Sequence, residues 1–230
     1  MIEAISFDAT GTLFTARDLG GDYARILERH GITLTPAELR STVVQVWREL
    51  GCVADPAQDR FARHPRGARG FWRDVLDRVC ALSSVVRPSA FAAAELFDHF
   101  GRGEAWRLYD DATPALETLA AAGLRLVVAS NWDERLPGVL DALGIGERFE
   151  SVVFSAAVGF EKPHPNLFAA VARRLDLPPE RILHVGDRRL EDLEGAQSAG
   201  FAALLLARGA DQAGDLDSLA EITGRLASLA

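Results

Sequence analysis

The stretch "IEAISFDATGTLF", residues 2–14, decides the fold of this chain. Residues 3–7, which include the run "AISF", predict a short buried strand, and a single acid, Asp8, stands where that strand ends. Residues 9–12 are small, hydroxyl-bearing or glycine, which is typical of a tight turn. We therefore expect a lone carboxylate at the end of a buried strand, and ask which other groups meet it there.

The chain from about residue 110 onward alternates between strand and helix patterns. Short apolar runs predict buried strands at 124–130, 151–155, 181–187 and 201–207. Helical patterns separate and follow these runs, and strands that alternate with helices form a parallel sheet covered on both faces. The N-terminal strand has no partner unless it joins that sheet. The sequence therefore predicts an α/β fold with a doubly wound, Rossmann-like parallel sheet.

Residues 16–107 show no obvious strand pattern and predict an inserted helical region. Its helical segments, several of them ended by Gly or opened by Pro, lie at 22–31, 36–51, 70–83 and 88–101. We predict two domains: an α/β core from residues 1–15 and 108–230, and an all-helical cap from 16–107. The connections near 14–18 and 107–111 are the expected hinges.

Composition excludes several classes of function. The 230 residues carry a net charge of −8, which gives no support to binding of duplex nucleic acid or of a membrane surface. The longest apolar runs are too short to span a bilayer, and no signal peptide is recognisable at the N-terminus. Cys52 and Cys80 fit buried thiols in a reducing compartment. We expect a cytoplasmic protein.

Polar residues follow the predicted strands at their carboxyl ends, which is where parallel α/β sheets bind ligands. These residues are Asp8, Ser130, Asn131, Lys162, Asp187 and Asp192. Carboxylate oxygens suit Mg²⁺, whereas hydroxyl and ammonium groups suit phosphoryl oxygens. The pattern predicts a site for a phosphate group and a metal ion.

Lys162 is the only lysine among 25 basic residues; every other one is arginine. This bias indicates a position that needs a compact ammonium rather than a planar guanidinium. The three carboxylates of Asp8, Asp187 and Asp192 would repel one another in a crevice. One Mg²⁺ together with Lys162 would nearly neutralise them, which gives the lone lysine a physical reason.

Four segments together resemble, in order, the motifs of the haloacid dehalogenase (HAD) superfamily. They are "DATGT" (8–12), "VVASN" (127–131), the lysine of "EKPHP" (161–165) and "GDRRLED" (186–192). The helical insertion is similar to the helical type-1 cap of that superfamily. The segments "SNWD" and "GFEKPHP" look most like its subfamily IA of small phosphatases and dehalogenase-like hydrolases.

The resemblance implies a role for each site residue. Asp8 would be the nucleophile that attacks phosphorus and forms an aspartyl-phosphate. Ser130, with Asn131, would bind the transferred phosphoryl group, and Lys162 would hold the nucleophile and the phosphate in place. The backbone N–H groups of residues 9–12 would stabilise the phosphoryl oxygens.

The resemblance also implies a Mg²⁺ site. Its ligands would be Asp8, the backbone carbonyl of Thr10, and Asp187, with Asp192 supporting them. Taken alone, Asp192 also fits an acid in the first turn of a helix, and Ser130 also fits a helix N-cap. Glu191 is expected to be only a first-turn helix acid.

Thr10 departs from the pattern, because phosphatases of the superfamily usually carry a second Asp there. A hydroxyl cannot exchange the protons that this Asp exchanges, a loss that costs about 10²–10⁴-fold in rate. The favoured interpretation is a slow or selective Mg²⁺-dependent phosphohydrolase of a small phosphorylated or otherwise anionic metabolite, best with acyl or aryl phosphates. The alternatives are a non-catalytic regulatory binding protein and, less favoured, a metal-independent 2-haloacid dehalogenase.

The predicted cap carries an arginine-rich stretch at residues 59–73, "DRFARHPRGARGFWR". If this stretch faces the site, it would favour a substrate with negative charge beyond its phosphate; the alternative is a solvated basic loop. Trp47, Trp72 and Trp106 lie among apolar residues at helical spacing, so we expect them in the interior of the cap; the alternative is that they are stacking platforms for a ligand.

Overall fold

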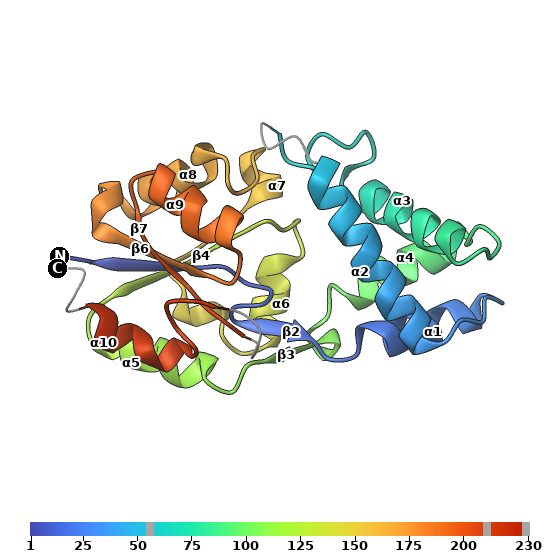
Figure 1. The fold of residues 1–230 in the computed structure, drawn as a ribbon, viewed down its shortest axis with the longest axis horizontal. Coiled ribbons are helices and arrows are strands. Elements are labelled where there is room, and N and C mark those ends of the chain that lie inside the picture. Colours follow the sequence, from blue (N-terminus) through green and yellow to red (C-terminus); the bar gives the residue numbers. More distant parts are fainter. Residues whose placement is uncertain (54–57, 209–212, 227–230) are drawn as a thin grey trace.

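A parallel sheet forms the centre of the protein in a computed structural model. The structure describes residues 1–53, 58–208 and 213–226, with side chains omitted at 51–53. Within this described part, five strands pair in parallel in the order β5-β4-β1-β6-β7 (Figure 1). Their bounds are β1 (Ala4–Phe7), β4 (Arg125–Ser130), β5 (Ser151–Phe154), β6 (Ile182–Gly186) and β7 (Ala202–Leu205). The N-terminal strand lies at the middle, which confirms the predicted α/β fold.

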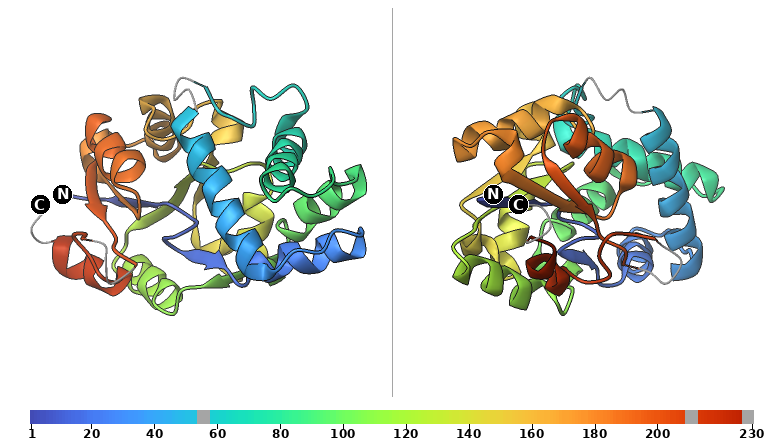
Figure 2. Two further views of the ribbon diagram at one scale, coloured as in Figure 1. Left: turned by 45° about the vertical axis from the view of Figure 1, so that its right-hand side comes forward. Right: turned by 60° about the vertical axis from the view of Figure 1, so that its left-hand side comes forward.

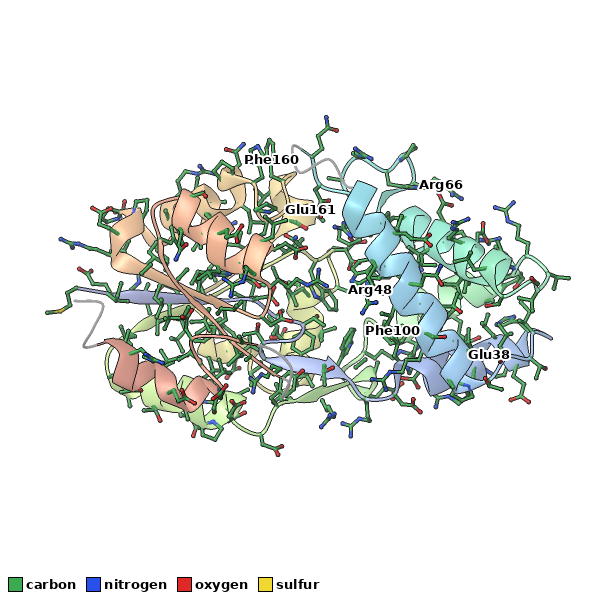
Figure 3. The ribbon with its side chains drawn as sticks, in the orientation of Figure 1. Glu38, Arg48, Arg66, Phe100, Phe160 and Glu161 are labelled. Atoms are coloured by element: carbon green, nitrogen blue, oxygen red, sulfur yellow. The ribbon has the colours of Figure 1, made fainter. Side chains whose placement is uncertain are left out.

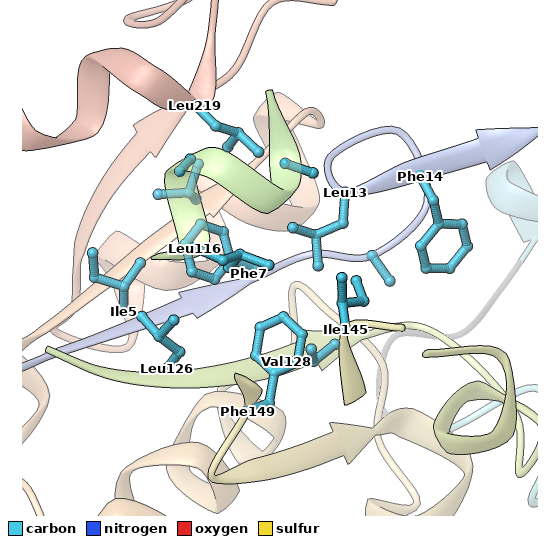
Figure 4. Close-up of a cluster of buried hydrophobic side chains, with 14 of the residues drawn as sticks. Ile5, Phe7, Leu13, Phe14, Leu116, Leu126, Val128, Ile145, Phe149 and Leu219 are labelled. Atoms are coloured by element: carbon cyan, nitrogen blue, oxygen red, sulfur yellow. The ribbon is translucent and has the colours of Figure 1, made fainter. Parts of the chain in front are cut away.

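Helices cover both faces of the sheet. Successive side chains of each strand point to opposite faces, so both faces carry apolar side chains against which helices pack. Ile5 and Phe7 of β1 pack into one apolar cluster with Leu116 of the helix α5, as Figure 4 shows. Ala4 packs into the opposite cluster with Phe168 of α8. The helices of this part are α5 (Ala112–Ala121), α6 (Leu136–Ala142), α7 (Ser155–Val158), α8 (Pro165–Leu175), α9 (Gly195–Ser198) and α10 (Ile222–Leu226). Short 3₁₀ turns lie at Gly103–Ala105, Gly146–Arg148, Pro179–Arg181 and Leu219–Glu221, and a π-helical segment, η4, covers Arg189–Glu194.

The helical region predicted between residues 16 and 107 has its own apolar interior. Its helices are α1 (Leu19–Arg29), α2 (Pro36–Val53), α3 (Gly67–Leu82) and α4 (Ala90–His99). They bury a shared cluster that includes Ile26, Leu39 and Val79, and they lie together beyond one end of the sheet (Figure 1 and the left view of Figure 2). We call them the cap helices; the exact domain boundaries stay a prediction. No helix in the described ranges combines the length and apolar character needed to cross a membrane.

The two connections to the cap helices form a strand pair that the sequence pattern did not predict. β2 (Phe14–Ala16) pairs antiparallel with β3 (Trp106–Leu108). The expected interior position of Trp106 in the cap is wrong, because its ring packs into the cluster of the α/β part, 5.3 Å from the ring of Phe14. Each strand is only three residues long, too short for a period-two pattern to be recognised.

Cys80 is buried in α3 among the cap helices, as expected for a structural thiol. Burial, together with the nearby Asp77 carboxylate, raises the pKa of Cys80 to about 11, so the thiol stays protonated and unreactive. The side chain of Cys52 lies outside the described residues.

Candidate active site

Three predicted acids meet at the carboxyl ends of the central strands. Asp8 follows β1, while Asp187 follows β6 and Asp192 lies in η4. Each offers a carboxylate oxygen, and these atoms lie within 4.8 Å of one another. The crossover topology brings together residues that are about 180 positions apart in the chain.

The side chain of Lys162 donates hydrogen bonds to two of these acids. Its buried Nζ donates to Oδ1 of Asp8 at 2.7 Å, to Oδ1 of Asp192 at 2.5 Å and to the carbonyl of Ala129 at 2.9 Å. Burial alone would lower the pKa of Lys162, but the charges of Asp192 and Asp8 outweigh it and raise that pKa above its usual range. The ammonium therefore remains charged at neutral pH, and all three of its hydrogens are used.

The two carboxylate oxygens of Asp8 differ: Oδ1 accepts hydrogen bonds, and Oδ2 is left for a reaction partner. Ser130 Oγ donates to Oδ1 of Asp8 at 2.8 Å, and Lys162 donates to the same oxygen. Among the described residues, the hydrogen bonds found for this carboxylate all go to Oδ1. The carboxylate is thus held in one orientation while Oδ2 is kept for another partner.

Asp192 is fully enclosed by donors. Its Oδ2 accepts the backbone N–H of Arg188 at 2.9 Å, and its Oδ1 lies 3.2 Å from Nε2 of His184. Burial would raise the pKa of Asp192, but Lys162 and His184 outweigh it and hold that pKa well below its ordinary value. An anion so fully bonded acts as a support for Lys162.

His184 is a residue that the sequence reasoning missed. It is completely buried in β6, with its Nδ1 2.7 Å from Oγ of Ser6. Burial lowers the pKa of His184, so the ring is neutral; donating from Nε2 to Asp192 leaves Nδ1 to accept from Ser6. The sequence feature that could have identified it is a single histidine inside the apolar run "ILHVG".

Asp187 is the acid whose surroundings fit a metal ion. Its Oδ1 is buried and has no hydrogen-bond partner within the described part of the chain. Burial, with repulsion from Asp8 and Asp192, raises the pKa of Asp187 to about 7. An orphaned carboxylate oxygen beside two further carboxylates is the donor set that Mg²⁺ prefers, so the residues present fit the expected ion.

Gly11 lets the turn after β1 approach Asp187 closely. Its φ is +97°, and a Cβ built there would lie 2.4 Å from Oδ2 of Asp187. Any side chain at this position would both strain the backbone and collide with the acid. The glycine of the "DATGT" turn is thus required by the geometry of the site.

The turn itself corrects one expectation about phosphate binding. The N–H of Gly11 donates to the carbonyl of Phe14 at 2.8 Å, and that of Thr12 donates to Ala9 at 3.3 Å. Of residues 9–12, these two N–H groups stabilise the turn internally. The hydroxyl of Thr10 is exposed at the site and accepts a hydrogen bond from Nε1 of Trp132 at 2.9 Å.

The side-chain amide of Asn131 bonds to the backbone of Lys162, in addition to its place at the site. Its Oδ1 accepts the backbone N–H of Lys162 at 2.6 Å, and its Nδ2 donates to the carbonyl of Lys162 at 3.0 Å. Both ends of the amide therefore clamp the loop that carries the lysine. These bonds support a positioning role; the expected contact with substrate stays a prediction.

A cavity of about 410 Å³ extends from the acids to the cap helices. Trp47 and Trp72 line it from the cap side, with ring centroids 5.2 Å apart and nearly parallel planes. The expected interior position is wrong for Trp47, and for Trp72 it holds only in part, since Trp72 packs against the apolar cluster of the cap helices and also lines the cavity. From the other side Trp132, Asp133, Arg135, Arg188 and Glu191 line the same space, and the sequence reasoning assigned none of them to the site.

The arginine-rich stretch does not supply free positive charge to this cavity. Arg66, Arg69 and Arg73 pair with Asp74, Asp98 and Asp77. Of the arginines in this stretch, only Arg60 lines the cavity, and Glu161, which Figure 3 shows on the side of the α/β part facing α2, pairs with it at 2.6 Å.

Comparisons with known proteins agree with this arrangement. A model of the haloacid dehalogenase-like hydrolase family matches residues 2–200. The human "Haloacid dehalogenase-like hydrolase domain-containing protein 3" is 32% identical over 208 residues, which cover 89% of this chain and 82% of that protein. A "Glyceraldehyde 3-phosphate phosphatase" of Methanopyrus kandleri is 30% identical over 215 residues, covering 91% of this chain and 85% of the relative.

A solved structure shows the same fold. The L-2-haloacid dehalogenase of Xanthobacter autotrophicus superposes with a TM-score of 0.76 at 23% identity, covering 100% of both chains. At that identity the likeness concerns the fold alone. Together, the family match over most of the chain and the two sequence relatives establish that this protein is a member of the haloacid dehalogenase-like hydrolase family.

Proposed function

We propose that the protein is a Mg²⁺-dependent phosphohydrolase that acts through an aspartyl-phosphate on Asp8. The observation that carries this proposal is the Asp8 carboxylate, fixed through Oδ1 by Lys162 and Ser130, with Oδ2 left for attack. The phosphatase name of the archaeal relative supports the reaction class.

The chemistry has two steps. Oδ2 of Asp8 forms a bond to phosphorus as the bond from phosphorus to the leaving-group oxygen breaks, and the leaving group departs with that electron pair. Water then attacks the phosphorus of the aspartyl-phosphate, which releases phosphate and restores the carboxylate. Lys162 and the hydroxyl of Ser130 compensate the negative charge of the phosphoryl oxygens in both steps.

Asp8 and Asp187, with the backbone carbonyl of Thr10, would hold Mg²⁺, and Asp192 would support them through Lys162. When bound, the ion would neutralise charge on the acids and on the phosphoryl group. The orphaned Oδ1 of Asp187 supports this assignment. A metal-free haloacid displacement gives that buried oxygen no use, so the dehalogenase alternative is disfavoured.

Thr10 shapes the rate. Its hydroxyl accepts a hydrogen bond from Trp132, and a hydroxyl is too weak an acid to protonate a departing alkoxide. Leaving groups that depart as stable anions, such as acetate or a phenolate, need no such donor. The first step is therefore expected to be fast with acyl and aryl phosphates and slow with alkyl phosphates.

The test is phosphate release from acetyl phosphate and p-nitrophenyl phosphate in Mg²⁺, with wild type and Asp8→Asn. We expect Asp8→Asn to lose at least about 10³-fold in kcat. The exposed Asp110→Asn variant serves as the matched control and keeps wild-type rates. Equal rates in Asp8→Asn, or full activity in excess chelator, would refute the proposal.

A further inference from the structure

The cavity above the acids has an apolar far wall. The cap helices contribute Val43, Trp47, Trp72, Leu76, Leu96 and Phe97 to its lining. Asp8 and Thr10 lie at its base, so anything bonded to phosphorus at Asp8 must project toward this wall. Apart from the Tyr23 hydroxyl and the Trp47 indole N–H, the lining that the cap helices contribute is carbon surface, so a polar leaving group would lose water contacts there and gain few hydrogen bonds in return.

Aromatic rings line the cavity at both ends. At the cap end, Trp47 and Trp72 are stacked, and the ring of Phe61 lies 6.1 Å from that of Trp72 at an angle of 24°. At the base, Trp132 reaches the hydroxyl of Thr10. Trp47 and Trp72 stack on each other, with Arg60 over the ring of Trp47 and Arg135 over that of Trp72, so these rings favour an aromatic partner through the apolar area that they bury rather than through stacking.

The cationic groups that reach the cavity are already neutralised. Of the described residues that line it, the positively charged ones are Arg60, Arg135 and Arg188. Arg60 binds both oxygens of Glu161 through its Nε at 2.9 Å and is only 13% exposed. A second anionic group of a substrate would have to compete with a buried carboxylate for this guanidinium.

Arg135 is held still more tightly. It donates to both oxygens of Asp133, at 2.8 and 2.6 Å, and to the carbonyl of Phe97 at 2.7 Å. Its guanidinium lies 3.8 Å from the centre of the Phe97 ring. The third arginine, Arg188, is half exposed and pairs with Glu191 at 3.1 Å. The cavity therefore offers apolar surface, and each of the three arginines that line it is already paired with a carboxylate.

From this lining we infer that the substrate is a phosphate monoester with an uncharged aromatic leaving group that departs as a phenolate, an aryl phosphate. The inference rests on the proposed phosphohydrolase function and adds its substrate class. It differs from the expectation, drawn from the arginine-rich stretch, that the substrate carries negative charge beyond its phosphate. A small polar sugar phosphate would make little apolar contact with the wall of the cavity. The missing proton donor at position 10 agrees with it, because a phenolate departs without protonation.

Binding of phosphonates tests the inference without requiring turnover, because their carbon–phosphorus bond is not hydrolysed by attack of a carboxylate. We expect 2-naphthylmethylphosphonate to bind at least about tenfold more tightly than methylphosphonate in Mg²⁺, measured by titration calorimetry. Affinities within threefold, or no binding of either compound, would overturn the inference. The proposed function fails separately, when acetyl phosphate and p-nitrophenyl phosphate show no Asp8-dependent turnover.

A variant pair locates the effect in the cavity. Val44 lines it from α2 and is 37% exposed, so a polar side chain can be accommodated there. Val44→Arg is expected to weaken naphthylmethylphosphonate binding about tenfold and to strengthen binding of phosphonoacetate, which carries a second anion. Gln45→Arg adds the same charge at the next, exposed position outside the lining and is expected to change neither affinity. Equal effects of the two variants would contradict the assignment of this wall to the leaving group.

Discussion

The ammonium of Lys162 lies 2.7 Å from Oδ1 of Asp8 and 2.5 Å from Oδ1 of Asp192, so one side chain links the proposed nucleophile to the acid in η4. The side chains of Lys162 and Asp192 are each only 1% exposed, and that of Asp8 is 11% exposed. It fixes the orientation of Asp8 and at the same time balances two negative charges. Substitution of Lys162 is therefore expected to affect both catalysis and stability.

Lys162→Arg is expected to lower kcat at least about 10²-fold, because a planar guanidinium does not fit a space shaped for three converging acceptors. Lys162→Met should in addition lower the free energy of unfolding by about 3–5 kcal/mol, since it leaves Asp8 and Asp192 buried without their cation. Phosphate release and urea unfolding measure the two effects. Arg173→Met, which removes an exposed charge on α8, is the control. Wild-type rates in Lys162→Arg would show that a compact ammonium is not needed.

Thr10→Asp is expected to raise turnover of alkyl phosphates by about 10²–10⁴-fold, because a carboxyl group can protonate the alkoxide and then activate water. Aryl phosphates should gain much less in the first step. Thr10→Asn is the matched control, since its amide has a similar shape and cannot exchange protons. If Thr10→Asp folds, binds Mg²⁺ and still gains no more than Thr10→Asn, the missing acid is not what limits the rate.

Gly11→Ala is expected to weaken Mg²⁺ binding at least about tenfold, because its Cβ would displace the Asp187 carboxylate. Gly123→Ala provides the control. Gly123 also has a positive φ, +83°, but a Cβ there meets no atom within 4 Å. Both variants should lose about 1 kcal/mol of stability from backbone strain. Titration calorimetry with Mg²⁺ and thermal unfolding separate the two effects; equal Mg²⁺ affinities in the two variants would exclude Asp187 as a ligand.

Asp111 is expected to make the stability depend on pH. Burial would raise the pKa of Asp111, but the N–H of Leu219, the hydroxyl of Ser218 and the guanidinium of Arg208 outweigh it and lower that pKa. A lowered folded-state pKa gives stability that is present above the unfolded value, near 3.9, and is lost as the pH falls through the folded value.

Asp111→Asn should therefore cost about 1 kcal/mol at pH 7, allowing for solvent screening of a partly exposed group, and nearly nothing at about pH 2. Urea unfolding at the two pH values measures the difference. The neighbouring exposed variant Asp110→Asn should show little change at either pH. A constant cost for Asp111→Asn across this range would refute the charged hydrogen-bond network.

The sequence by itself determined the sheet and the composition of the acidic edge. Apolar runs of four to seven residues identify the strands, and the carboxyl ends of parallel strands necessarily share one edge. Asp8, Ser130 and Asp187 therefore could be assigned to one site without coordinates. The roles of these residues stay predictions, because position at an edge does not establish chemistry.

Other features depended on the tertiary structure. The pairing of Arg60 with Glu161 joins residues 101 positions apart, and Trp72 donates through Nε1 to Asp133 across the same boundary between the cap helices and the core. The periodicity of the local sequence does not predict which arginine pairs with which carboxylate. Only the packing of the cap helices against the α/β part decided that the cavity is largely apolar and that its arginines are paired, since residues far apart in the chain form an ion pair only where folding brings them together.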